Sequence, residues 1–204
     1  MDKQSVFKLL IDDASACKLC ENMCDRTAVL SGLNGSVDAR IMFIGEAPGR
    51  KGADRTRVPF SGDQSGKNLD RFLDSIKLSR DQVFITSAAL CNPRTDSGAN
   101  RKPTQKELGN CSSYLRRTIE LIDPAVIVTL GSVALEALKR IHYHDLNLKE
   151  HAAQVHEWQG RRLVPIYHPS PQVLASHRRE QQQLNDYRVV LQALKRLDKQ
   201  TGVK

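Results

Sequence analysis

The sequence predicts an α/β fold: a three-layer αβα sandwich with a central, mostly parallel four-stranded sheet. Four short apolar runs, bounded by polar or glycine residues, are typical of strands that are buried on both faces. They are residues 39–45, 82–86, 125–131 and 163–167. Segments with helical spacing alternate with these strands, as in a parallel sheet covered by helices. We expect a single domain over residues 1–204, with the N-terminal segment 1–27 tied to its core.

Five helices are predicted around the sheet. Apolar residues at helical spacing predict helices over residues 4–16, around 69–76 and over 180–197. Thr104 and Glu107 form a capping box, which predicts a helix that begins there and runs to about Ile122. Ser132 is expected to cap a short helix over residues 134–141. Helices between the strands supply the crossovers that parallel strands require.

Composition limits the classes of partner. The chain has 31 Lys and Arg against 23 Asp and Glu, a formal net charge of +8. A polyanion such as nucleic acid is therefore one candidate partner, although an ordinary basic surface gives the same balance. The sequence contains neither an apolar run of about 18 residues nor a signal-peptide pattern at its start. We expect a cytoplasmic monomer without a membrane partner, whose cysteines ligate metal or stay free rather than form disulfides.

Glycine-rich and polar motifs follow the predicted strands, at the carboxyl ends where ligands bind in parallel sheets. The loop after the first strand holds Gly45–Gly49 (GEAPG), Gly52–Thr56 (GADRT) and Pro59–Gly66 (PFSGDQSG). The fourth strand ends in Tyr167–Ser170 (YHPS). Each motif alone has little specificity, because a glycine-rich loop after a strand can hold any phosphate.

Together, and in this order, the four motifs resemble the iron–sulfur uracil-DNA glycosylases, and the resemblance covers roughly residues 15–190. It implies a monofunctional hydrolase that removes uracil from DNA in base excision repair, with other deaminated bases as further candidate substrates. A non-catalytic iron–sulfur protein that binds uracil-containing or single-stranded DNA is the alternative. An iron–sulfur electron carrier is a more remote one.

Two families of these enzymes share features with the chain. GEAPG and the Pro59–Phe60 pair are similar to family 4, whereas GADRT and the segment after Phe60 are closer to family 5. Family 4 carries a Thr-Asn pair after the second strand, whose Asn reads the uracil, but this chain has Thr86–Ser87 there. In family 5 the corresponding Asn lies further along, and that position is Asn100. The resemblance therefore favours a family 5-like enzyme.

Cleavage of a nucleotide's glycosidic bond requires a carboxylate near the sugar and a hydrogen-bond donor at the base, because opposite charges build on the two. The resemblance makes Asp54 the first candidate for the carboxylate and Glu46 the second. Asp54 could instead cap a surface turn, and Glu46 could instead fix its own loop. His168, held at a strand end, is the candidate donor to the base carbonyl, with a structural role as its alternative.

Recognition of a base outside the helical stack requires a stacking surface and a polar reader. Phe60 is expected to stack on the base, and Asn100 to read its Watson–Crick edge, since an amide offers a donor and an acceptor. Gly45 and Ala47 are expected to belong to the substrate site, where Ala47 leaves space for the base. Core packing is the alternative for Phe60 and a turn is the alternative for Asn100, whose substitute as reader is Asn92.

The segment after His168 is interpreted as a loop that contacts DNA. A small apolar tip can fill the space left by a flipped nucleotide, and the nearby arginines can bind phosphates. The candidates for DNA contact are Ser170, Gln172, Leu174, Arg178 and Arg179. The alternative is an ordinary loop that opens a basic helix.

Cysteine spacing indicates a tetrathiolate site. Cys17 and Cys20 form a CxxC pair, and Cys91 and Cys111 follow far along the chain. Spacing alone does not separate zinc from an iron–sulfur site. The resemblance implies a [4Fe–4S] cluster, with zinc less favoured, on these four cysteines and with a structural role. Cys24 is expected to stay free.

Overall fold

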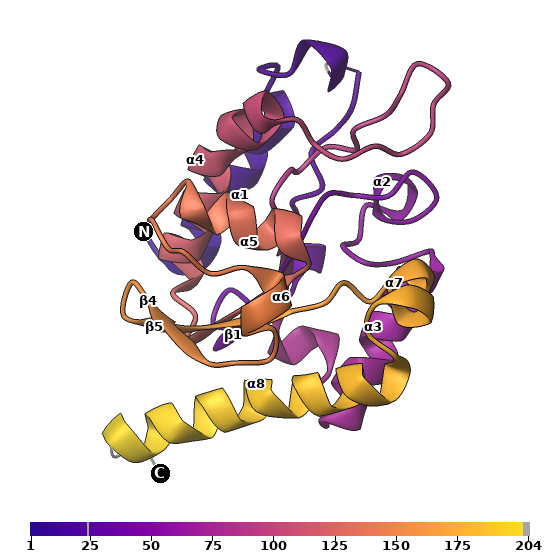
Figure 1. Cartoon of the computed structure of the whole chain (residues 1–204). Coiled ribbons are helices and arrows are strands. Elements are labelled where there is room, and N and C mark those ends of the chain that lie inside the picture. Colours follow the sequence, from indigo (N-terminus) through magenta and orange to yellow (C-terminus); the bar gives the residue numbers. More distant parts are fainter. Residues whose placement is uncertain (24, 202–204) are drawn as a thin grey trace.

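A computed structural model describes residues 1–23 and 25–201, without the side chains of 196–201. At its centre is a five-stranded sheet with the order β2-β1-β3-β5-β4 (Figure 1). The strands are β1 (Ile41–Gly45), β2 (Phe84–Ser87), β3 (Val126–Leu130), β4 (His156–Trp158) and β5 (Arg161–Ile166). β2, β1, β3 and β5 run parallel, and β4 pairs antiparallel with β5. The predicted mostly parallel sheet is confirmed, but four was the wrong number of strands.

The additional strand, β4, is short and lies at the edge of the sheet. Of its three residues only Trp158 is buried. A tight turn at Gln159 and Gly160, both with positive φ, joins it to β5. A short, largely polar edge strand contains no apolar run, so hydrophobic periodicity does not reveal it.

The long helices lie where the sequence predicts them. They are α1 (Lys3–Ala16), α2 (Ala53–Thr56), α3 (Gln64–Ser75), α4 (Gln105–Ile122), α5 (Ser132–Lys139), α6 (Leu148–His151), α7 (Pro171–Ser176) and α8 (Glu180–Thr201). The capping box of Thr104 and Glu107 at the start of α4 is confirmed. Ser132, in contrast, is the first residue of α5, and Gly131 occupies the cap position. The short helices α2, α6 and α7 were not predicted.

None of the helices in the described ranges combines the length and the apolar character that a membrane span needs.

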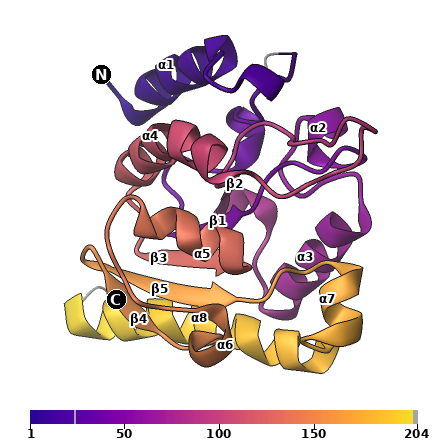
Figure 2. The same cartoon turned by 45° about the horizontal axis from the view of Figure 1, so that its top comes forward.

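Two helical layers cover the sheet (Figure 2). On one face, Met42 and Ile44 of β1 pack into a core that also takes in α1, α4 and α5. On the other face, Phe43 of β1 packs with Phe72 of α3 and Tyr187 of α8. Successive residues of β1 thus enter opposite cores, as a strand buried on both faces requires.

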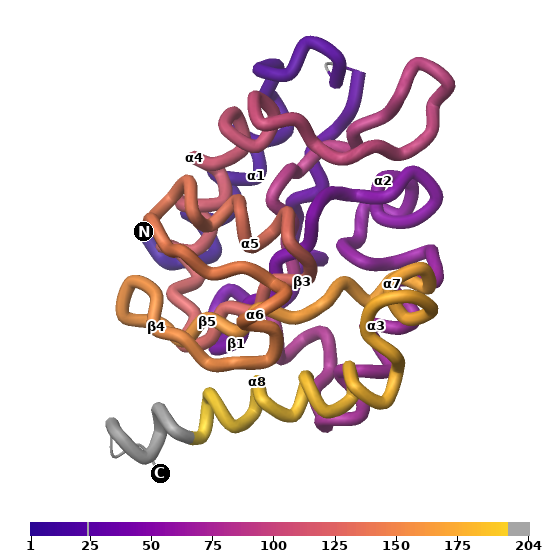
Figure 3. The backbone as a smooth tube through the Cα atoms, in the orientation of Figure 1, coloured from indigo at the N-terminus to yellow at the C-terminus, as the bar shows by residue number. Residues whose placement is uncertain are grey.

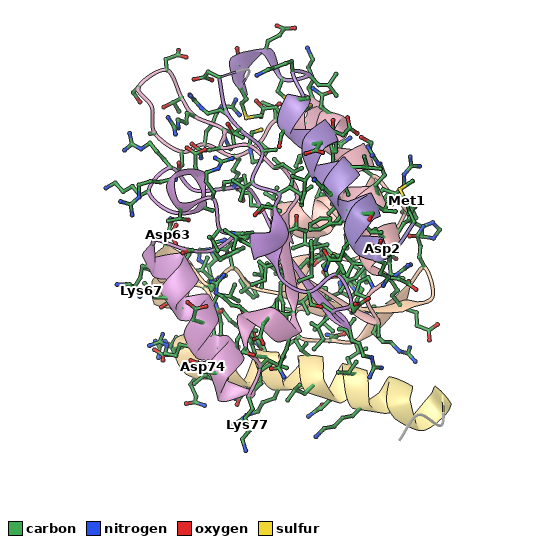
Figure 4. All side chains as sticks on the ribbon, turned by 180° about the vertical axis from the view of Figure 1, so that it is seen from behind. Met1, Asp2, Asp63, Lys67, Asp74 and Lys77 are labelled. Carbon is green, nitrogen blue, oxygen red and sulfur yellow. The ribbon has the colours of Figure 1, made fainter. Side chains whose placement is uncertain are left out.

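The long loops gather at one end of the molecule. The segment between β1 and α3 and the segment between β2 and α4 both lie on the side where α7 lies (Figure 3). The labelled Asp63 marks the start of α3 at this end, while Lys77 lies beyond its other end (Figure 4). The parallel strands deliver these loops to one edge, because their carboxyl ends point the same way.

The start of α3 gives a first prediction, about Gly66. A Cβ atom at Gly66 would lie 2.1 Å from the carbonyl oxygen of Phe60, whereas one at Gly32 would meet nothing within 4 Å. We expect Gly66→Ala to lower the free energy of unfolding by about 2 kcal/mol through overpacking, despite alanine's better helix propensity. Gly32→Ala is the control and should change it by less than about 0.5 kcal/mol. Chemical denaturation measures both, and equal stabilities of the two variants would contradict the close approach.

Candidate active site

A cavity of about 600 Å³ opens beyond the carboxyl ends of the four parallel strands. Every one of these strands contributes to its wall, through Glu46 after β1, Ser87 of β2, Leu130 of β3 and His168 after β5. The predicted site residues that the structure brings together here are Glu46, Ala47, Phe60, Asn100, His168, Ser170 and Gln172. The loops that carry the motifs therefore share one hollow.

Phe60 forms part of the cavity wall in an unusual backbone conformation. Its φ is 50°, in the left-handed region that bulky residues rarely adopt. Arg80 holds this conformation by donating to the carbonyl oxygens of Pro59 and Phe60. The ring edge lies so close to Gly45 that a Cβ there would be 2.5 Å from it. Gly45, predicted to bind substrate, instead lies outside the cavity wall and makes room for the Phe60 ring.

His168 lies directly against Phe60 in the cavity. The two ring centroids are 5.5 Å apart and their planes are tilted by 36°. Burial lowers the pKa of His168 to about 4, and the nearby Asp63 only partly opposes this effect. The imidazole is therefore neutral at physiological pH, with one N–H donor and one acceptor nitrogen.

The two predicted carboxylates occupy different environments. Glu46 lines the cavity, where burial raises its pKa and the nearby Lys102 opposes the rise. Asp54 does not line the cavity. Its side chain is only 10% exposed and is paired with Arg94 and, at 3.7 Å, with Arg57. Glu46 thus belongs to the cavity wall, whereas Asp54 is an ion-pair partner outside it.

Arg57 connects Asp54 to a further segment of the chain. Its guanidinium also donates to the carbonyl oxygens of Thr27 and Ala28, at 2.7 and 2.8 Å. Asp54 thereby joins α2 to the segment after the first cysteines and, through Arg94, to the loop after β2. Local sequence patterns could not show that Arg94, 40 residues further along the chain, would pair with Asp54.

Asn100 and Asn92 form an amide pair at the cavity wall. Asn92 is 1% exposed and donates to the Pro48 carbonyl oxygen at 2.5 Å and to Asn100 Oδ1 at 3.1 Å. Asn100 Oδ1 also accepts from the backbone N–H of Arg50 at 3.0 Å. These bonds occupy the oxygen of Asn100 and leave its NH₂ as the group available to a ligand.

The predicted DNA-contacting segment is a helix, α7, rather than a loop. Ser170 caps it and, like Gln172, lines the cavity. Leu174 packs against the core under α3 and α8, so it is not an exposed wedge tip. Arg178 forms a two-bond ion pair with Asp186, at 2.6 and 2.9 Å, and is therefore not a free phosphate ligand. Arg179 is exposed.

Sequence reasoning missed several polar residues of the cavity wall, among them Asp63, Ser87 and Lys102. Asp63, the N-cap of α3, lines it and lies close enough to His168 to influence the imidazole's pKa. Ser87 ends β2, and Lys102 faces Glu46 from the loop before α4. The signal for Ser87 was its place at a strand end. Asp63 and Lys102 carried no comparable signal, because they reach the cavity only through loop folding.

The four predicted cysteine ligands come together near the N-terminal segment. Burial, and then the charges of Cys111, Cys17 and Cys20, raise the pKa of the Cys91 thiol to about 12. Asn110 donates to the sulfur of Cys20 at 3.4 Å. Within residues 1–23 and 25–201, no three or more His, Cys, Asp or Glu side chains are placed to hold a metal ion. Cys24 lies outside the described residues.

The low pKa of His168 gives a prediction for the pH dependence of stability. In the unfolded chain the pKa of His168 is near 6.5, so the unfolded state binds a proton as the pH falls below that value. The folded state binds this proton only near pH 4. Stability is therefore complete above pH 6.5 and falls as the pH drops through this window. Between pH 7 and pH 5 the wild type should lose about 2 kcal/mol more unfolding free energy than His168→Gln. Urea titrations at both pH values measure this difference, and parallel losses in both proteins would exclude a buried neutral His168.

Comparison with known proteins agrees with this architecture. Residues 34–195 match the model of the uracil DNA glycosylase superfamily. The type-4 uracil-DNA glycosylase of Thermotoga maritima is 31% identical over 82% of this chain and 83% of its own length. That of Archaeoglobus fulgidus is 33% identical over 84% and 85%. The type-5 enzyme of Pyrobaculum aerophilum is 36% identical over 67% and 64%. The chain belongs to the uracil-DNA glycosylase superfamily.

Proposed function

We propose that the chain is a monofunctional DNA glycosylase that hydrolyses the N-glycosidic bond of uracil in DNA, as a step of base excision repair. The observation that carries the proposal is one cavity that brings together a carboxylate, Glu46, a neutral imidazole, His168, and a stacking ring, Phe60. These are the groups that the reaction needs at the sugar, at the base carbonyl and at the base plane. The similar proteins named uracil-DNA glycosylase support the choice of substrate.

Glu46 acts at the sugar in this mechanism. As a carboxylate it orients a water molecule, accepts its proton and stabilises positive charge on the sugar as the base departs. Burial raises its pKa, and the charge of Lys102 opposes this rise. Asp63 is the second carboxylate of the cavity, but one of its oxygens is engaged in capping Gly66 of α3.

His168 and Phe60 act at the base. Phe60 offers its face to the flipped pyrimidine, and the neutral His168 donates its N–H to the base oxygen on which negative charge builds. The unoccupied NH₂ of Asn100 donates to a base carbonyl, and Ala47 leaves room for the ring. The geometry does not separate family 4-like from family 5-like chemistry: the cavity carboxylate is the family 4-like Glu46, and the amide reader is the family 5-like Asn100.

Contact with DNA is assigned to the residues around the cavity that remain available. Ser170 and Gln172 face the cavity from α7, and Arg179 is exposed just beyond it. Arg179 takes this role in place of Arg178, because Asp186 binds the Arg178 guanidinium through Nε and Nη2. Salt-dependent affinity for DNA is expected from the basic charge balance.

We further propose that Cys17, Cys20, Cys91 and Cys111 hold a [4Fe–4S] cluster. Four thiols from distant parts of the sequence share one neighbourhood, which fits the donor set of such a cluster. The cluster would tie the segment 1–27 to the loop before α4 and so complete a single domain over 1–204. When bound it supplies structural cross-linking, and the cleavage step uses only the cavity residues.

Substitutions of the two carboxylates test the glycosylase proposal. We expect Glu46→Gln to slow uracil release in single-turnover assays by about 100-fold or more, since it removes the base that activates water. His168→Ala and Asn100→Ala should also slow it, as they remove donors to the base. Asp54→Asn should lower thermal stability but leave the rate of the folded protein within about 3-fold, because it removes an ion-pair partner outside the cavity.

The product separates enzyme from binding protein. Incubation with a uracil-containing duplex should give free uracil and an abasic site, without strand cleavage. Borohydride should trap no Schiff base between the DNA and Lys102, the lysine of the cavity wall. A tight wild-type complex that yields no abasic product would establish the non-catalytic alternative. An inactive but fully stable Asp54→Asn would return Asp54 to the first position among the carboxylates.

Cluster removal is a separate prediction. Chain purified without oxygen should contain about four iron and four sulfide per molecule, as the four cysteine ligands imply. Cys111→Ser should lower the iron content and the melting temperature, because a buried ligand is lost. Cys24→Ser is the control, with iron content unchanged. Stoichiometric zinc without iron in the wild type would exclude the cluster.

A further inference from the structure

Two buried amides from the helical layer hold the backbone around His168. Asn68 of α3 donates its Nδ2–H to the carbonyl oxygen of Pro169 at 2.7 Å. Gln183 of α8 donates its Nε2–H to the carbonyl oxygen of His168 itself at 3.2 Å. Asn68 is 3% exposed and Gln183 is 0% exposed. Two adjacent carbonyl groups of the active-site segment are thus bound from two different helices.

The orientation of the Asn68 amide is fixed by its other end. Its Oδ1 accepts from Gln64 at 3.1 Å and from Arg71 at 3.4 Å, both on α3. Since the oxygen is engaged by these donors, the NH₂ end must face Pro169. The helix therefore holds a donor ready toward this carbonyl group.

Within the described parts of the chain, the Gln183 amide uses its NH₂ group but not its oxygen in hydrogen bonds. Its NH₂ faces two carbonyl oxygens, those of His168 and, at 3.5 Å, of Arg178. Its Oε1 is buried without a hydrogen-bond partner among the described residues. A buried unpaired oxygen destabilises the fold. The side chain therefore binds the carbonyl groups at the two ends of the segment 168–178, although its own oxygen stays without a hydrogen bond within residues 1–23 and 25–201.

Backbone restraint matters here because no hydrogen bond to a ring nitrogen of His168 fixes the imidazole in the described part of the chain. The ring packs beside Phe60 and near the Asp63 carboxylate. The direction of the ring is then set mainly by the backbone at His168. Figures 1 and 2 both show α7 beside α3 and the start of α8, the elements that supply the two amides.

We propose that Asn68 and Gln183 are positioning residues: by holding the His168 and Pro169 carbonyl groups from α3 and α8, they aim the His168 imidazole at the base. The inference rests on the proposed glycosylase function. Neither residue lines the cavity, so neither touches the substrate and both act through His168. A displacement of about 1 Å in a reacting group costs up to 100-fold in rate.

A double-mutant cycle with His168 tests the proposal. In single-turnover assays on a uracil-containing oligonucleotide, Asn68→Leu and Gln183→Met should each slow uracil release at least tenfold. The dissociation constant for the oligonucleotide, measured by fluorescence anisotropy, should change less than threefold. In the His168→Ala background the same substitutions should have less than a twofold effect, because the group that they position is gone.

Asn34→Leu is the matched control. Asn34 is also buried, at 1% exposure, and donates to a backbone carbonyl, that of Ile85, at the same 2.7 Å, but away from the cavity. It should leave the release rate within threefold. A similar loss in Asn34→Leu, or equal factors with and without His168, would overturn the proposal and reduce both residues to general stability.

The outcomes separate this proposal from the function on which it rests. A wild-type chain that releases no uracil would overturn the proposed function and this inference with it. An active wild type whose Asn68 and Gln183 variants behave like Asn34→Leu would overturn this inference alone. If Asn68→Leu does not fold, Gln183→Met carries the same cycle.

Discussion

Parallel pairing of β2, β1, β3 and β5 is the constraint on which the rest of the molecule depends. Because the four strands point the same way, the chain leaves each of them at one edge of the sheet. Glu46, Ser87, Leu130 and His168 lie at or just after those strand ends, and all four line the cavity. The two cores behind them, one under each helical layer, keep the strands in register. The active-site rim is thus a consequence of topology before any side chain interacts with another.

Arginines stabilise the loops of this rim, and they account for part of the chain's basic character. Arg80 binds the carbonyl groups of Pro59 and Phe60, and Arg57 joins Asp54 to the N-terminal segment. Arg178 is paired with the buried Asp186. Each of these guanidiniums fixes a loop that carries cavity residues. A positive net charge therefore does not translate directly into phosphate contacts, since several of its cations already have partners inside the protein.

Much of the site was predictable because motif and strand end coincide in the sequence. Glu46, Phe60 and His168 lie in motifs next to predicted strands, and the structure places all three at the cavity. The long helices and the parallel strands were predictable because hydrophobic periodicity marks elements that are buried along their length. The edge strand β4 and the helix α7 were not, since each is short and contains few buried residues.

The sequence by itself determined the family and the parallel sheet, because these depend on residue types and on their order along the chain. Only the tertiary structure showed that Glu46, Asp63 and Lys102 line the cavity, and that Asp54 pairs with Arg94 outside it. The physical reason is that the surroundings of an ionisable side chain depend on how the loops fold against one another. Arg94 lies 40 residues from Asp54 along the chain, and local sequence patterns do not record such a contact.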